Sequence, residues 1–266
     1  MLKKLSVRIF LKPPNLACLY SQFIKNYSGE TTMTWETEKE KFVKMTASQK
    51  KGPSFKIVTV STIPTWKTIF QNKTSELAKE IPRLPRNTIN PAMNKELADK
   101  ISYYKGDITH LEVDAIVNAA NKSLLGGGGV DGAIHRTAGH FLLQECKTLM
   151  GCNVGEAKIT GGYELPAKYV IHTVGPQGEK PDLLSQCYKN SLKLFFEQNL
   201  RTIAFPCIST GIYGYPLEPA AHVAVNEVRS FLESNSSKVD RIIFCLFADQ
   251  DVTIYQGVLQ SYFPLK

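Results

Sequence analysis

Hydrophobic and polar positions follow two different regimes along the chain, and the change lies near residue 100. From Ile101 onward, short β-branched runs alternate with stretches whose apolar residues recur at helical spacing. The runs predict strands at 115–117, 168–174, 202–205 and 241–247, and the helical spacing predicts helices at 182–198, 219–232 and 252–262. Such alternation is typical of an α/β domain with helices on both faces of a mainly parallel sheet, where ligands bind at the carboxyl ends of the strands.

The first hundred residues carry weaker patterns. Residues 34–51 are rich in charge with sparse apolar points, which predict one short helix, and a second apolar anchor lies around Trp66. Pro82, Pro85 and Pro91 lie in a stretch without apolar periodicity, as in a linker. We therefore predict a helical extension with a Pro-containing linker at 28–95, followed by the main domain at 96–266.

The N-terminal 27 residues are basic and contain no acidic side chain. Apolar residues recur at helical spacing between the first cations, a pattern typical of a mitochondrial presequence. The alternative is a disordered tail, because Pro13 and Pro14 would break a helix there. We expect a targeting segment at 1–27 and a mitochondrial protein, with a nuclear or cytosolic protein as the alternative.

The positive charge of the chain lies outside the main domain. Residues 1–100 carry 18 Lys and Arg against 8 Asp and Glu, whereas residues 101–266 carry 14 against 16. A groove for nucleic acid would need clustered cations on the folded domain, so we expect no direct nucleic-acid partner. No apolar run approaches the roughly 20 residues of a membrane span, so no membrane partner is expected either. The 6 cysteines include no CxxC pair, which favours free thiols over a zinc site or a disulfide framework.

Four consecutive glycines, Gly126 to Gly129, form the first chemical motif. Without side chains they leave backbone amides open to an anion, and they lead into a predicted helix whose N-terminus favours phosphate. The alternative is a flexible loop. Gly127, Gly129 and Gly132 also match the GxGxxG dinucleotide fingerprint, but residues 122–125 separate them from the strand and no acidic residue closes the next strand.

A second loop of the same kind follows the strand at 202–205. It combines two hydroxyls with two glycines and could hold the other side of a pyrophosphate; its residues are Ser209, Thr210, Gly211, Ile212, Tyr213 and Gly214. Neither loop contains the GK[ST] of nucleoside triphosphatases. Two amides, Asn118 and Asn121, end the strand at 115–117, where they are equally consistent with contacts to sugar hydroxyls and with turn formation.

Taken in this order, the motifs resemble the MacroD family of macrodomains over residues 96–266, nearest to its mitochondrial branch. The segments that carry the resemblance are 105–109, 118–121, 126–132, 167–176 and 206–214. The resemblance implies a three-layer α/β/α fold around a mixed, largely parallel sheet, after a short helical N-terminal extension. It implies a monomeric hydrolase without a cofactor that removes mono-ADP-ribose from Asp and Glu side chains of proteins and also deacetylates O-acetyl-ADP-ribose. The alternative is a non-catalytic ADP-ribose reader.

The resemblance also implies roles for single residues. Asp107 and Ile108 would bind the adenine, and Phe247 would stack on it, although without the family it would be taken for a core residue. Asn121 would contact ribose hydroxyls together with Asn118, and Asp131 would act as the catalytic base, with His135 orienting it from the same helical face. The diphosphate and distal ribose would lie between two loops, formed by Gly127, Gly128, Gly129 and Val130 and by Ser209, Thr210, Gly211, Ile212 and Tyr213. His172 is expected to be a hydrogen-bonded core histidine, and no metal site is expected because no third ligand is placed near Asp131 and His135.

Overall fold

The computed structural model describes residues 33–52, 54–77 and 89–265, so the expected targeting segment at 1–27 lies outside the described residues. Residues Trp35 to Lys266 form one compact unit. Among the described helices, none is both long and apolar enough to cross a membrane.

A six-stranded sheet forms the centre of this unit, in the order β2-β8-β7-β4-β6-β5. All neighbours pair in parallel except β5, which runs antiparallel to β6 at the edge. The strands are β2 (Ile101–Lys105), β4 (Ala115–Ala120), β5 (Ala157–Gly161), β6 (Tyr169–Val174), β7 (Thr202–Phe205) and β8 (Arg241–Leu246). The mixed, largely parallel sheet expected from the sequence is confirmed.

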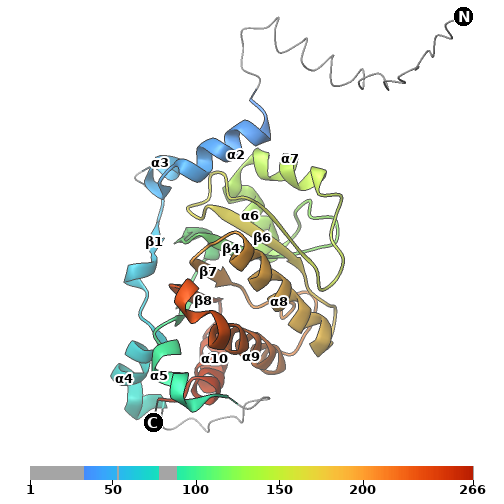
Figure 1. Cartoon of the computed structure of the whole chain (residues 1–266). Coiled ribbons are helices and arrows are strands. Elements are labelled where there is room, and N and C mark those ends of the chain that lie inside the picture. The colour runs from blue at the N-terminus through green and yellow to red at the C-terminus, as the bar shows by residue number, and fades with distance from the viewer. Residues whose placement is uncertain (1–32, 53, 78–88, 266) are drawn as a thin grey trace, which may run out of the picture. The chain divides into compact units, whose positions relative to one another are not determined.

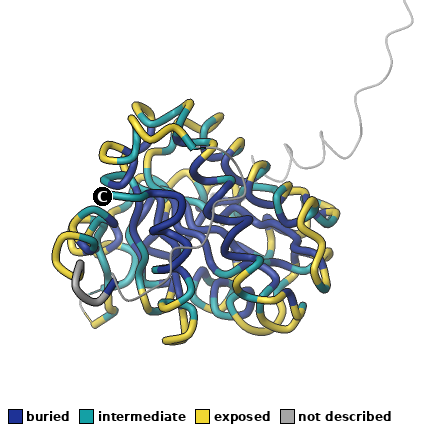
Figure 2. The backbone as a smooth tube through the Cα atoms, turned by 90° about the horizontal axis from the view of Figure 1, so that it is seen from below, coloured by how far each residue is buried: buried dark blue, intermediate teal, exposed yellow. Residues whose placement is uncertain are grey.

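Helices cover both faces of the sheet (Figure 1). One face carries α6 (Gly129–Ala138) and α7 (His140–Thr148); the other carries α8 (Pro181–Glu197), α9 (Leu217–Asn235) and α10 (Asp249–Tyr262). Successive residues of a strand point to opposite faces, so Ala115 and Val117 pack in the core under α8 to α10 while Ile116 packs in the core under α6 and α7. The backbone of the central strands is buried, and exposure is concentrated in the surrounding loops (Figure 2). The three-layer fold is therefore confirmed.

The N-terminal extension contains α2 (Trp35–Lys44), α3 (Ala47–Lys51), α4 (Trp66–Leu77) and α5 (Asn94–Leu97). A single helix was predicted at 34–51, but the chain breaks at Thr46 because this residue caps α3. Its Oγ1 accepts from the Gln49 amide at 3.3 Å, and its own amide donates to Gln49 Oε1 at 2.8 Å. This capping box starts a new helix.

The remaining elements are short. The strands β1 (Val58–Thr59) and β3 (Leu111–Glu112) pair in parallel apart from the main sheet. The described residues also contain the 3-10 helices η1 (Val60–Thr62), η2 (Pro91–Met93), η3 (Ile108–His110) and η4 (Ser236–Lys238).

The described part of the extension packs against the main domain. The side chain of Trp66 is fully buried in the core under α8 to α10, and its indole N–H donates to the carbonyl of Phe263 at 3.0 Å. On the other side, Lys39 of α2 forms an ion pair of 2.6 Å with the buried Glu145 of α7. Lys51 of α3 donates to the carbonyl of Thr137, in α6, at 2.8 Å. The extension thus belongs to the same compact unit as residues 96–266.

Candidate active site

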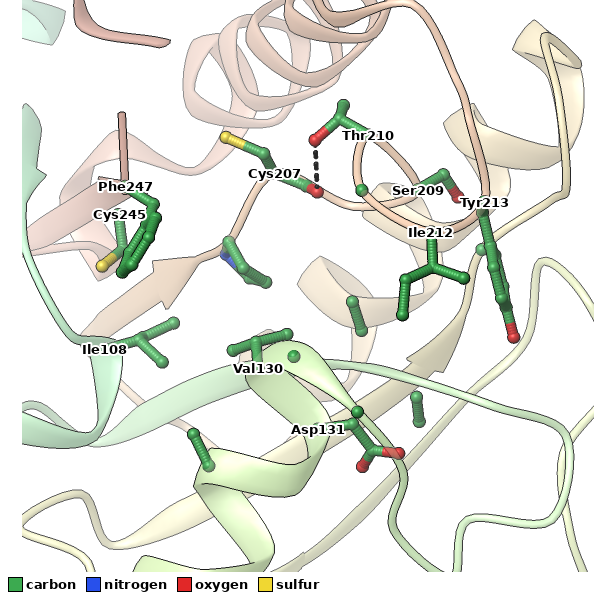
Figure 3. A pocket seen from close by; sticks show the side chains of 18 of the residues that line it. Ile108, Val130, Asp131, Cys207, Ser209, Thr210, Ile212, Tyr213, Cys245 and Phe247 are labelled. Atoms are coloured by element: carbon green, nitrogen blue, oxygen red, sulfur yellow. Dashed lines mark hydrogen bonds between the residues drawn. The ribbon is translucent and has the colours of Figure 1, made fainter. Parts of the chain in front are cut away.

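A cavity of about 740 Å³ opens at the carboxyl ends of the parallel strands. It is lined by every residue that we expected to contact a ligand or act on it, except two: Asn118 and His135. The expected residues that line it are Asp107, Ile108, Asn121, Gly127, Gly128, Gly129, Val130, Asp131, Ser209, Thr210, Gly211, Ile212, Tyr213 and Phe247. Five strands that are distant in sequence therefore bring the motifs together around one cavity (Figure 3).

The glycine segment forms one wall. α6 begins at Gly129, whose φ of +57° lies in the left-handed region. A Cβ on Gly127 would lie 3.0 Å from Asp131 Oδ2, a tight contact, so glycine favours the close passage of the loop past the carboxylate. In the described part of the chain, no hydrogen bond uses the amides of Gly127, Gly128, Gly129 or Val130 as donors. This wall presents a row of open N–H groups at a helix N-terminus, which is an anion-binding arrangement.

The loop after β7 forms the opposite wall. It is closed on itself by the Tyr215 amide, which donates to the Ser209 carbonyl at 3.0 Å. Within the described residues, the amides of Gly211, Ile212 and Tyr213 have no acceptor either. The two loops approach each other here, since a Cβ added to Gly128 would be 3.6 Å from Cδ1 of Ile212. Residues whose amides donate no hydrogen bond within the described chain thus line the cavity on both sides, an arrangement that can bind a pair of phosphates.

One end of the cavity carries an exposed aromatic ring. Phe247 is 84% exposed, which excludes the alternative that it belongs to the core. Its backbone is fixed because Asp251 Oδ2 accepts from the amides of Phe247, at 3.0 Å, and Ala248, at 2.9 Å. Asp107 lies at the same cavity; its Oδ1 accepts from the Thr109 amide at 2.9 Å. Its Oδ2 has no hydrogen-bond partner among the described residues and is open to a ligand donor.

Asp131 lies toward the other end, with Ile212 and Tyr213 (Figure 3). Only 3% of the residue is exposed, and its Oδ1 accepts from Asn118 Nδ2 at 2.8 Å. Burial raises the pKa of the Asp131 carboxyl, against the opposing effects of the Asn118 hydrogen bond and of His135. Oδ2 has a single weak neighbour, Asn121 Nδ2 at 3.5 Å, and is the oxygen left to accept a proton. A buried carboxylate with a raised pKa suits general-base chemistry.

His135 lies beneath Asp131 rather than on the cavity wall. Its Nε2 is 3.5 Å from Asp131 Oδ1, yet that nitrogen makes no hydrogen bond of acceptable geometry within the described chain. The contact is therefore electrostatic and acts only when the ring is protonated. Burial lowers the pKa of His135, more than Asp131 raises it, so the imidazole is neutral at pH 7.

The two asparagines, equivalent in the sequence, occupy different places. Asn121 lines the cavity and also shapes the glycine loop, since its Nδ2 donates to the Gly126 carbonyl at 2.8 Å and its Oδ1 accepts from Ser123 Oγ at 2.6 Å. Asn118 is fully buried and does not reach the cavity. We expected it at the end of a strand, but β4 continues to Ala120, which turns residue 118 toward α6. Asn118, which we expected to contact the ligand, donates to Asp131 behind the cavity wall.

Sequence reasoning missed several residues of the cavity wall. These are Gly106, Ala119, Ala120, Ala133, Gly175, Pro206, Cys207, Cys245 and Asp251. Gly175 had a detectable signal, because it directly follows the strand at 168–174. A Cβ at this position would lie 2.0 Å from Ser209 Oγ, so glycine is required for the second loop to fit.

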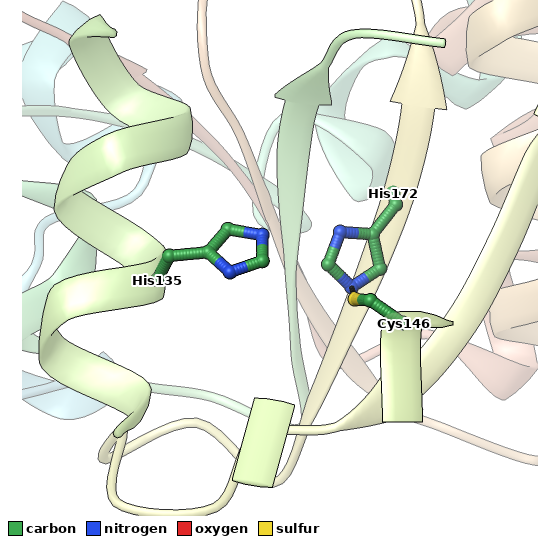
Figure 4. A group of neighbouring side chains, drawn as sticks. All are labelled: His135, Cys146 and His172. Atoms are coloured by element: carbon green, nitrogen blue, oxygen red, sulfur yellow. Dashed lines mark hydrogen bonds between the residues drawn. The ribbon is translucent and has the colours of Figure 1, made fainter. Parts of the chain in front are cut away.

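Three potential metal ligands meet behind the cavity: His135, Cys146 and His172, with one ligand atom of each within 4.8 Å of the others (Figure 4). Our premise that no third ligand lies near His135 was therefore wrong, because α7 supplies Cys146. Both ring nitrogens of His172 are already hydrogen-bonded, to Asn118 at 3.1 Å and Thr160 at 2.9 Å, as expected for a core histidine. Burial raises the pKa of Cys146 to about 12, and a metal would need the thiolate. The group is a packed polar cluster.

Comparison with known proteins agrees with this geometry. The model of the Macro domain matches residues 117–224. The ADP-ribose glycohydrolase MACROD2 of Mus musculus is 50% identical over 245 residues, which are 90% of this chain and 50% of that protein. The ADP-ribose glycohydrolase MACROD1 of Bos taurus is 48% identical over 243 residues, 88% of this chain and 72% of that protein. A crystal structure of the Trypanosoma brucei macrodomain in complex with ADP-ribose has a TM-score of 0.68 and 40% identity, and covers 83% of this chain and 86% of that one.

The chain therefore belongs to the macro domain family, with the MacroD proteins, as the order of its motifs predicted. It spans about half the length of the MACROD2 proteins that it matches.

Proposed function

We propose that this protein binds ADP-ribose in the cavity and hydrolyses it from the Asp and Glu side chains of mono-ADP-ribosylated proteins. The observation that carries the proposal is the position of Asp131, a buried carboxylate next to two loops that present open main-chain donors. Two similarities support it: the MacroD relatives are named ADP-ribose glycohydrolases, and the similar Trypanosoma brucei macrodomain binds ADP-ribose in its crystal structure.

The ligand would be oriented by the two ends of the cavity. Adenine would stack on the exposed ring of Phe247, and its amino group would donate to Asp107. The diphosphate would accept from the amides of the two loops, which act without a cation. The distal ribose would then lie against Asp131 and Asn121, at the end of the cavity where Ile212 and Tyr213 lie.

In the reaction, Asp131 Oδ2 would accept a proton from a water molecule whose oxygen attacks C1″ of the distal ribose. The new O–C1″ bond replaces the bond to the acceptor, and the Asp or Glu carboxylate leaves with the electron pair. General-base assistance of this kind is typically worth about 10²–10⁴-fold in rate. O-Acetyl-ADP-ribose carries an ester on the same ribose, so we propose its deacetylation as a second activity of the site.

Release of ADP-ribose from a glutamate-automodified acceptor tests the proposal. Asp131→Ala and Asn121→Ala should each slow release. Asp182→Ala is the matched control, because Asp182 also lies in the first turn of a helix, α8, but is exposed and away from the cavity. Normal release by both cavity variants would contradict the assignment. A wild-type protein that binds ADP-ribose and releases none would instead be the reader that we consider the alternative.

We also propose that residues 1–27 direct the chain to mitochondria. The support is the basic, acid-free composition of this segment alone. Imaging of the tagged full chain and of a version without residues 1–27 tests it: the first should reach mitochondria and the second should not. A mitochondrial signal from both would contradict it.

A further inference from the structure

A row of buried polar side chains runs across the sheet beneath Asp131. Thr160 of β5, His172 of β6 and Asn118 of β4 are all fully buried and lie on the face covered by α6 and α7. His172 is the direct neighbour of Asn118 in the parallel pairing of β4 and β6. Hydrogen-bond distances join the whole row: Thr160 Oγ1 to His172 Nε2 is 2.9 Å, His172 Nδ1 to Asn118 Nδ2 is 3.1 Å, and Asn118 Nδ2 to Asp131 Oδ1 is 2.8 Å.

The proton on each of these atoms follows from the chemistry of its neighbour. The amide nitrogen of Asn118 has two hydrogens and only donates, so His172 Nδ1 and Asp131 Oδ1 both accept. With Nδ1 as an acceptor, a neutral His172 carries its proton on Nε2. The Thr160 hydroxyl donates to the Gly161 carbonyl at 3.1 Å, so its oxygen is open to accept from Nε2–H.

The reverse arrangement is disfavoured at both ends. If the Asn118 amide turned over, its Oδ1 would face the ionised carboxylate of Asp131 at hydrogen-bond distance, and two acceptors would repel each other. If His172 carried its proton on Nδ1, that N–H would face the Asn118 amide nitrogen. Oδ1 of Asn118 has no hydrogen-bond partner in the described chain, so the amide is held by its two donated bonds alone. Its orientation therefore depends on the tautomer of His172.

We propose that Thr160 and His172 are positioning residues for Asp131: the Thr160 hydroxyl selects the Nε2–H tautomer of His172, and this tautomer aims the Asn118 amide at the carboxylate. The expected effect of these residues on catalysis rests on the proposed function. The expected positions of the protons on His172 and Asn118 do not depend on it.

The titratable groups around Asp131, in the part of the chain that the structure describes, are His135 from its own helix, Cys146 from α7 and His172 from β6. Burial lowers the pKa of His172 to about 3, so the ring stays neutral across neutral pH. The Cys146 thiol stays protonated, since burial raises its pKa to about 12. Cys146 Sγ also lies 3.8 Å from His172 Nε2 and is the weak acceptor that remains if the hydroxyl is removed.

Two substitutions at Thr160 test the proposal with the full chain. Thr160→Val keeps the shape of the side chain and removes the acceptor, and Thr160→Ser restores the hydroxyl. We expect Thr160→Val to lower kcat for release roughly 10- to 100-fold, as misplacement of a catalytic group does, without changing the Kd for ADP-ribose, because both loops are intact. Thr160→Ser should recover most of the rate.

The matched control is Thr173→Val. Thr173 is equally buried, in β6, but its hydroxyl donates to the Glu156 carbonyl at 2.8 Å and takes no part in the row. It should keep the wild-type kcat. An equal loss of rate in both valine variants would show general damage to the sheet and would overturn the positioning role.

Nuclear magnetic resonance provides a measurement that does not depend on catalysis or on any variant folding. The ¹⁵N shifts of His172 in the wild-type protein should show the neutral Nε2–H form from pH 5 to pH 8; a charged ring or the Nδ1–H form would overturn the proposal. In Thr160→Val we expect a mixture of tautomers and a raised pKa of the Asp131 carboxyl, because the Asn118 hydrogen bond that lowers it is weakened. If the wild-type protein releases no ADP-ribose, the proposed function fails while these signals still decide the proton positions.

Discussion

Two charged side chains that are buried on opposite faces of the central sheet, Arg229 and Asp131, differ in how completely their surroundings are hydrogen-bonded. Arg229 belongs to α9 and is 2% exposed. Every nitrogen of its guanidinium donates to an acceptor at 2.6 to 2.8 Å; the acceptors are Glu233 Oε1, Asn94 Oδ1 and the carbonyls of Tyr262 and Asn90. Asp131 belongs to α6 and is almost as buried. Two polar atoms of its neighbours, Asn118 Oδ1 and His135 Nε2, make no hydrogen bond in the described chain.

Complete and incomplete hydrogen bonding have different uses. A fully bonded buried charge holds distant segments in one arrangement, and Arg229 joins α9 to the extension and to the end of α10. A buried charge with incomplete hydrogen bonding can still accept a hydrogen bond from a ligand. Its burial costs free energy, which favourable contacts elsewhere in the fold offset. Loss of Arg229 should therefore act on stability, and loss of Asp131 on chemistry.

The largest effect is expected from Asp131→Asn. Release of ADP-ribose should fall about 10²–10⁴-fold because the general base is lost. Thermal unfolding, measured alongside, should not occur at a lower temperature. Burial raises the pKa of this carboxyl, so the ionised form opposes folding and a neutral amide does not. A large drop in Tm would place Asp131 in the same class as Arg229 and end the contrast.

Arg229→Met should have the opposite profile. Removal of one partner from a buried ion pair typically costs about 3–5 kcal/mol, and the two backbone carbonyls also lose a donor. Urea unfolding should show this loss, while kcat at low temperature, per folded molecule, stays near the wild-type value. Lys189→Met is the control: Lys189 pairs with Glu227 at 3.7 Å but its side chain is 63% exposed, so about 1 kcal/mol or less is expected.

A smaller and graded effect is expected from pH. Asp131 acts as a base only when ionised, so kcat/KM should rise with pH through a pKa above the ordinary aspartate value. Asn118→Ala removes the hydrogen bond that lowers this pKa, and the acid limb should move to higher pH. The same raised pKa sets how stability depends on pH. The free energy of unfolding of the wild type should fall relative to that of Asp131→Asn as pH rises through the raised pKa, because the folded state then holds an ionised buried carboxylate. The two proteins should be equally stable below about pH 4, where Asp131 is protonated in both the folded and the unfolded wild type. An acid limb that does not move in Asn118→Ala would contradict the link between the two residues.

The smallest effect is expected from salt. Among the described residues, no Lys or Arg lines the cavity, and the phosphates would be held by uncharged amides. Calorimetry should find the Kd for ADP-ribose changed on the order of twofold or less between low and moderate ionic strength, unlike the steep dependence of binding by cationic side chains. A steep loss of affinity would mean that cations outside the described cavity wall hold the ligand.

The local parts of this site could be predicted from the sequence. Glycines 126 to 129 and the loop at 209–214 follow strands that the hydrophobic pattern reveals, and parallel strands place such loops at one edge. Phe247 needed the family resemblance, because an aromatic residue after a strand is more often part of a core. The edge strands β2 and β5 were not predicted, since their Lys, Ser, Thr and Gly residues give no regular apolar pattern.

The polar row beneath Asp131 could not be predicted for a different reason. Periodicity tells which side of a strand a residue faces, but not which residues of separate strands lie side by side. Thr160, His172 and Cys146 became neighbours of the site only through the pairing of β5, β6 and β4 and the docking of α7. The place of Asn118 differs from the prediction for a simpler reason. We expected the strand to end at residue 117, but β4 continues to Ala120, so Asn118 lies inside the strand.

The bond from Trp66 to the carbonyl of Phe263 has a consequence for the order in which the molecule is made. Its two residues are separated by 197 positions, so a ribosome has produced nearly the whole domain before the indole finds its acceptor. A contact between residues so far apart in the sequence forms more slowly than a local helix does. The core that encloses Trp66 is therefore complete only when the residues around Phe263, at the end of α10, have docked.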